Sequence, residues 1–109
     1  MNLRDLTLNY FKTFSSQDLE GLEGLFSRDV YLRDWEISAH GIDDVVKANR
    51  GIFDSVDTIE ITPVEICETG NMTASEIEIC INNDQILKVV DILEFNGDGK
   101  IAAIRAYKG

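Results

Sequence analysis

Hydrophobic residues recur at helical spacing in the first half of the chain and alternate with polar residues in the second half. Apolar side chains at every third or fourth position predict helices over residues 3–14, 18–26 and 41–54. Asp18 stands where an N-cap would begin the second helix, and residues 29–36 predict one short strand after it. The inner stripe of the third helix is Val45, Val46, Asn49, Ile52 and Phe53.

The second half of the chain predicts strands only. The predicted strands cover residues 58–69, 73–81, 86–95 and 100–107. Pro63 indicates an edge strand or a bulge, because proline has no N–H group for a sheet ladder. Residues 82–84 and 96–99 are rich in Asn, Asp and Gly and predict hairpin turns. The whole pattern predicts one α+β domain over residues 1–109, a curved antiparallel sheet covered on one face by three helices.

Asp91 places a carboxyl group inside an apolar run. A buried acid is unfavourable unless it is paired or protonated, and a neutral buried acid can donate a hydrogen bond to an oxyanion. The neighbours of Asp91 depend on the length of the turn at Asn82. A turn of two or four residues places Glu76, Glu78 and Cys80 on the face of Asp91, whereas a three-residue turn places the intervening isoleucines there.

We favour the three-residue turn at residues 82–84. It avoids burying further carboxylates beside Asp91, and it sets Glu78 opposite Lys88 on the outer face. If Phe95 and Lys100 then close the next hairpin, Asp91 is the lone charge in an apolar cavity. The inner face comprises Ile77, Ile79, Ile81, Leu87, Val89, Asp91, Leu93, Phe95, Ala102, Ile104 and Ala106.

The composition and net charge of the chain limit the classes of molecule that we expect as partners. The chain has 109 residues, of which 44% are hydrophobic, so disorder is not expected. The net charge of −10 argues against nucleic acid and against anionic membrane surfaces as partners. We expect neither a membrane span nor a signal peptide, and therefore a cytoplasmic protein. Cys67 and Cys80 are expected to be free thiols in a reducing compartment.

Several stretches resemble one known family. They are residues 18–22, 25–29, 90–101 and 104–107, together with the spacing of Tyr10, Asp34 and Asp91. The chain resembles the ketosteroid isomerase branch of the nuclear-transport-factor-2-like (SnoaL-like) superfamily over most of its length. The resemblance implies an NTF2-like (cystatin-like) fold, in which three helices cover the concave face of a cone-shaped sheet.

The resemblance also implies roles for three residues. Tyr10 falls on the family's oxyanion-binding tyrosine, Asp34 on its general base and Asp91 on its second, protonated oxyanion donor. Taken alone, Tyr10 is better explained as a core tyrosine, and Asp34 as a strand-end residue that pairs with a nearby arginine. Taken together, the three favour one shared pocket. We expect this pocket to be lined by Phe14, Leu32, Leu87, Val89, Leu93 and Ile104.

These roles imply acid–base enolisation and isomerisation of a small apolar carbonyl compound. We expect neither a cofactor nor a metal, because Asp34, Asp91 and His40, the single histidine, have no metal-ligand spacing. His40 is expected to be a solvated loop residue. Two other interpretations remain: a SnoaL-like polyketide cyclase or aldol-type enzyme, and a non-catalytic small-molecule-binding or dimerisation module. We also expect a homodimer, formed through an apolar outer sheet face that consists of Ile86, Val90, Ile92 and Ile101.

Overall fold

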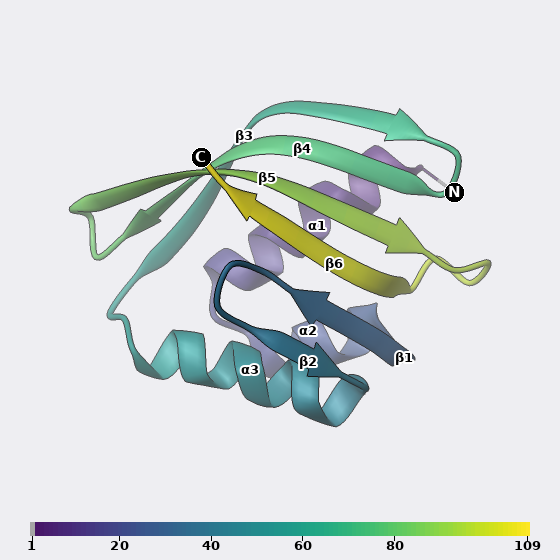
Figure 1. Ribbon diagram of the computed structural model, residues 1–109, viewed down its shortest axis with the longest axis horizontal. Helices are drawn as coiled ribbons and strands as arrows, with labels where there is room; N and C mark the ends of the chain where they lie inside the picture. The colour runs from purple at the N-terminus through teal and green to yellow at the C-terminus, as the bar shows by residue number, and fades with distance from the viewer. Residues whose placement is uncertain (1) are drawn as a thin grey trace.

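A computed structural model describes residues 2–109 as three helices and a six-stranded sheet. The strands lie in the order β2-β1-β6-β5-β4-β3 (Figure 1). The elements are α1 (Leu3–Ser15), α2 (Leu19–Leu25), β1 (Phe26–Arg33), β2 (Ser38–His40), α3 (Ile42–Asp54), β3 (Ile59–Thr69), β4 (Met72–Ile81), β5 (Gln85–Phe95) and β6 (Ile101–Lys108). Within the described residues, no helix is long and apolar enough to cross a membrane.

The first two helices begin at side-chain caps. Asn2 accepts a hydrogen bond from the backbone N–H of Asp5 (3.1 Å), and Asp18 accepts one from Gly21 (2.9 Å). Each cap satisfies a backbone donor that has no partner inside its helix. The start of α2 at Asp18 was therefore predicted correctly. The third helix follows Gly41, whose φ of +86° lies in the region that favours glycine.

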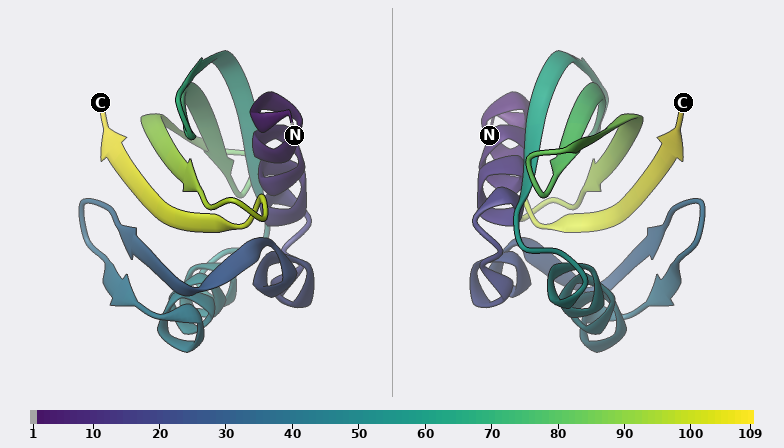
Figure 2. Two further views of the ribbon diagram at one scale, coloured as in Figure 1. Left: turned by 90° about the vertical axis from the view of Figure 1, so that its right-hand side faces the viewer. Right: turned by 90° about the vertical axis from the view of Figure 1, so that its left-hand side faces the viewer.

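The helices pack on the concave side of a strongly curled, open sheet (Figure 2). Helix α1 lies against β3 and β4, α3 lies against β1 and β2, and α2 contacts both of the other helices. The predicted α+β architecture is thus confirmed. The sheet is not wholly antiparallel, however, because β1 runs parallel to β6. This pairing brings the first strand of the chain beside the last.

Two strands differ from prediction. Strand β1 covers Phe26–Arg33, so it begins earlier and ends earlier than the predicted residues 29–36. Strand β2, which pairs with it, was not predicted and includes His40, which was expected in a loop. It has only three residues, and Ala39 is its single buried side chain. So short a strand has no detectable alternation.

The predicted turn between β4 and β5 is confirmed. Ile81 pairs with Gln85 across a three-residue turn, which sets Glu78 opposite Lys88 and Ser75 opposite Asp91. Glu78 and Lys88 form the expected ion pair at 3.1 Å. The apolar side chains of β4 and the Asp91 carboxyl group therefore share the inner face.

The next hairpin has a different register. Phe95 pairs with Ile101 rather than with Lys100, and Ala102 forms a bulge before Ala103 pairs with Glu94. The Asn96 side chain accepts hydrogen bonds from the N–H groups of Asp98 and Lys100, which stabilises a longer turn. Consequently Ala106 lies opposite Asp91. Ile101 is buried (2% exposed), so it is not part of the outer apolar face.

Candidate active site

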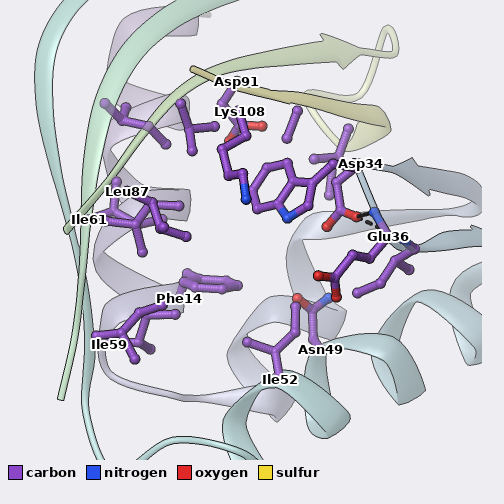
Figure 3. A pocket seen from close by; sticks show the side chains of 18 of the residues that line it. Phe14, Asp34, Glu36, Asn49, Ile52, Ile59, Ile61, Leu87, Asp91 and Lys108 are labelled. Carbon is purple, nitrogen blue, oxygen red and sulfur yellow. Dashed lines mark hydrogen bonds between the residues drawn. The ribbon is translucent and has the colours of Figure 1, made fainter. Parts of the chain in front are cut away.

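The inner face of the sheet and the helices enclose a cavity of about 330 Å³. Figure 3 shows Phe14, Ile59, Ile61 and Leu87 along its wall, with Asp91 and Asp34 also facing it. Most of the lining residues are aliphatic, and just over half of these aliphatic residues come from β3, β4 and β5. An apolar wall with a few polar groups is the usual form of a small-molecule site.

Asp91 lies on the inner face of β5 and is only 5% exposed. It lines the cavity, but its Oδ1 atom is enclosed by protein and has no hydrogen-bond partner among the described residues. Burial, and secondarily the charge of Asp34, raises the pKa of Asp91 to about 7. Near neutral pH a large fraction of Asp91 is therefore an uncharged acid, which can donate a hydrogen bond.

Tyr10 projects from α1 into the same region and is 4% exposed. Its ring packs against Phe11, Phe14 and Phe26, with centroid separations of 5.7, 6.2 and 6.4 Å. Burial raises the pKa of Tyr10 well above its ordinary value, and the charges of Asp91 and Asp34 raise it further. Tyr10 is thus held as a protonated hydrogen-bond donor close to both carboxyl groups.

Asp34 occupies the turn between β1 and β2. Its Oδ1 atom accepts hydrogen bonds from the backbone N–H groups of Glu36 (2.7 Å) and Ile37 (2.6 Å). Its own N–H donates to the Ile37 carbonyl at 2.9 Å and closes the turn. These two backbone donors fix the side chain and leave Oδ2 as the oxygen that can accept a proton.

Tyr10, Asp34 and Asp91, predicted from three separate parts of the sequence, all line this one cavity. The predicted lining residues Phe14, Leu32, Leu87, Val89 and Ile104 line it as well. The prediction for Leu93 was wrong, because Leu93 is fully buried in the core and does not line the cavity. It pairs with Thr73, whose hydroxyl bonds to Thr7 of α1. Leu93 therefore lies beside the point at which β4 contacts α1.

The rim of the cavity contains residues that were not predicted to line it. Trp35 and Glu36 come from the β1–β2 turn, and Lys108 from the end of β6, where its Nζ lies 5.6 Å from the centre of the Trp35 ring. Asn49 of α3 is 2% exposed and donates to the Val45 carbonyl at 3.0 Å. A polar residue in an apolar helix stripe is a signal that could have identified Asn49.

The described residues hold no group of three or more His, Cys, Asp or Glu side chains placed to bind a metal ion. His40 is exposed and stacks on Tyr31, with ring centroids 5.8 Å apart. It does not line the cavity. The polar side chains that line the cavity provide carboxyl groups, amides, hydroxyl groups, one indole and one lysine.

Several solved structures share this fold. A protein from Kribbella flavida with the provisional name ketosteroid isomerase is 20% identical and has a TM-score of 0.84, with 98% of this chain and 77% of that chain covered. A protein from Shewanella denitrificans, provisionally named a SnoaL-like polyketide cyclase, is 14% identical with a TM-score of 0.86, covering 98% and 90% of the two chains. An NTF2-like protein of unknown function from Cytophaga hutchinsonii is 12% identical with a TM-score of 0.83, covering 100% and 91%.

At these identities the structural likeness establishes the fold and not the activity. No protein of curated function matches the sequence. The sequence model described as the SnoaL-like domain matches residues 8–104, which is most of the chain. The cavity, the curled sheet and this match lead to one conclusion: the chain belongs to the SnoaL-like domain family.

Proposed function

We propose that this protein is a ketosteroid-isomerase-like enzyme that enolises and isomerises a small apolar carbonyl compound. The supporting observation is that one apolar cavity contains a buried acid with a pKa of about 7, a buried tyrosine and a carboxylate held by backbone donors. This is the set of groups that enolisation requires: a base for the carbon-bound proton, and two donors for the oxygen that becomes negative.

The proposed reaction moves one proton and leaves the oxidation state of the substrate unchanged. Asp34 Oδ2 removes a proton from the carbon next to the carbonyl group, and the C–H electron pair forms the enolate. Tyr10 and protonated Asp91 donate hydrogen bonds to the enolate oxygen. Asp34 then returns the proton to the same or to a conjugated carbon, and the carbonyl group forms again. Each preorganised donor of this kind contributes about 10²–10³ in rate.

The test is exchange of the α-protons of a simple bicyclic ketone, 2-tetralone, in deuterated buffer, followed by proton NMR. We expect the protein to accelerate exchange and Asp34→Asn to lose about 10³-fold, because the amide cannot accept the proton. Asp29→Asn is the matched control, since Asp29 is an exposed acid of β1, the strand that precedes Asp34. Absence of exchange by the unaltered protein would support a non-catalytic binding module instead.

A polyketide cyclase or aldol-type enzyme is the second candidate. It is favoured by the SnoaL-like family match and by the provisional name of the Shewanella denitrificans structure. Both reactions begin with removal of an α-proton, so exchange by itself does not separate them. Incubation with a linear poly-β-ketone separates them, because a cyclase forms a new carbon–carbon bond and an isomerase does not.

We also propose that the protein is a cytoplasmic homodimer. Ile86 and Val90 of β5 and Tyr107 of β6 are 58%, 41% and 51% exposed on the outer sheet face, and Val90 pairs directly with Tyr107. A second copy of this face would cover them. Cys67 and Cys80 are free thiols, which suits a reducing compartment. Sedimentation at micromolar concentration tests the dimer, and a monomer mass would contradict it.

A further inference from the structure

Two buried polar atoms that have no hydrogen-bond partner among the described residues lie on paired residues of β4 and β5. They are Oγ of Ser75 on β4 and Oδ1 of Asp91 on β5. Ser75 is 0% exposed and pairs directly with Asp91 in the antiparallel ladder. Side chains of directly paired residues project from the same face, with Cβ atoms about 4.5–5.5 Å apart. The hydroxyl and the carboxyl group therefore share one enclosed space.

A neighbouring hydroxyl provides an internal comparison. Thr73 lies two residues before Ser75 on the same face of β4 and is equally buried. Its hydroxyl is satisfied by Thr7 of α1 at 2.8 Å. Ser75 has no such partner on the helix, so its hydroxyl can pair with Asp91. An unpaired buried hydroxyl is unfavourable, and a serine side chain rotates readily between staggered positions, so this pairing is favoured.

We propose that Ser75 is a positioning residue for Asp91: its hydroxyl donates to Oδ1 and thereby directs the acidic proton of Asp91 to Oδ2, toward the cavity. A neutral carboxylic acid has one O–H donor and one carbonyl-type acceptor. If the enclosed oxygen is the acceptor, then the oxygen at the cavity carries the proton. The Ser75–Asp91 coupling stands on the sheet register and the burial of both atoms. Its importance for enolate binding rests on the proposed function.

The coupling has a measurable effect on titration. A donor to a carboxyl group favours the charged form, so the Ser75 hydroxyl offsets part of the rise in the pKa of Asp91 that burial causes. The other titratable groups that line this cavity are Tyr10 from α1, Asp34 and Glu36 from the β1–β2 turn and Lys108 from β6. Ser75→Ala leaves these four groups unchanged. A shift in the Asp91 midpoint in this variant therefore reports the loss of the hydroxyl.

The experiment is a carbon-13 carboxyl titration of Asp91 in the unaltered protein, in Ser75→Ala and in Thr73→Val. We expect Ser75→Ala to raise the pKa of Asp91 by about one unit, a tenfold increase in proton affinity. Thr73→Val removes a buried hydroxyl that already has another partner, so it should leave the midpoint in place while lowering stability. An unchanged or lowered Asp91 midpoint in Ser75→Ala would overturn the proposal.

Ser75→Cys gives a second arm that keeps the connectivity of the side chain and replaces the hydroxyl with a somewhat larger group that is a weaker donor. We expect it to shift the midpoint in the same direction by a smaller amount. It supplies the decisive result if Ser75→Ala does not fold, and an unmoved midpoint in Ser75→Cys then counts against the coupling. The α-proton exchange assay is separate: no exchange by the unaltered protein would refute the proposed function but not a shift caused by Ser75→Ala.

Discussion

Asp34 and Asp91 carry the same carboxyl group in two opposite environments. Asp34 lies in a hairpin turn, half-buried, and accepts two backbone hydrogen bonds. Asp91 lies within a strand of the sheet, is 5% exposed, and has an enclosed oxygen without a partner. Backbone donors hold the carboxyl group of Asp34 in one orientation at the cavity, whereas burial raises the pKa of Asp91 and favours its neutral form. The environment, rather than the residue type, thus equips one acid as a base and the other as a donor.

The largest expected effect is on the pH dependence of stability. Asp91 has a folded pKa of about 7 and an unfolded pKa near 3.9, so the folded state binds more protons between these values. Its stabilising contribution is present below about pH 4 and is lost as pH rises through 7. We expect the free energy of unfolding to fall by up to about 4 kcal/mol over this range, relative to Asp91→Asn. Urea denaturation of both proteins at intervals from pH 4 to 8 measures this difference, and parallel curves would contradict it.

The second effect concerns activity at Asp91. Replacement by leucine removes the donor, so we expect Asp91→Leu to lose about 10²–10³-fold in kcat for proton exchange. The amide of Asp91→Asn retains an N–H donor and should lose less than about tenfold. Exchange rates of the two variants are compared at pH 7. The comparison separates the effect of losing the hydrogen-bond donor from the effect of changing the side-chain volume. Equal losses would show that the donor is not important.

A smaller effect is expected at Tyr10. Tyr10→Phe removes one donor but keeps the ring among Phe11, Phe14 and Phe26, so the fold should persist. We expect kcat to fall by about 10²-fold, with Asp91 still able to donate. Kinetics of α-proton exchange at pH 7 test this expectation. A full rate in Tyr10→Phe would remove Tyr10 from the proposed mechanism.

The sequence predicted the strand register correctly where the alternative register would have been energetically unfavourable. The β4–β5 register followed from the cost of burying Glu76 and Glu78 beside Asp91, and the structure has that register. The β5–β6 register could not be found in this way. Ala102 and Ala103 are both small and apolar, so the pattern does not show where one residue bulges from the strand. Nor could β2 be found, since three residues are too few for a detectable pattern.

The candidate site was also predicted only in part. The alternation of side chains along the strand predicted the face on which Asp91, Val89 and Leu93 lie. It does not predict how far along that face the cavity extends. Leu93 is fully buried in the core and does not line the cavity. Trp35 and Lys108 reach the rim only because the β1–β2 turn and the end of β6 meet there. Such meetings depend on the curvature of the sheet, which the sequence pattern does not specify.

The most direct test of the contrast between the two acids is a carbon-13 carboxyl titration of the unaltered protein, with the Asp91 signal assigned by its disappearance in Asp91→Asn. We expect Asp91 to titrate with a midpoint near pH 7, because burial and the charge of Asp34 both oppose its ionisation. An Asp91 signal that shows a fully ionised carboxylate from pH 5 to 8 would contradict the donor role, and with it the proposed enolisation.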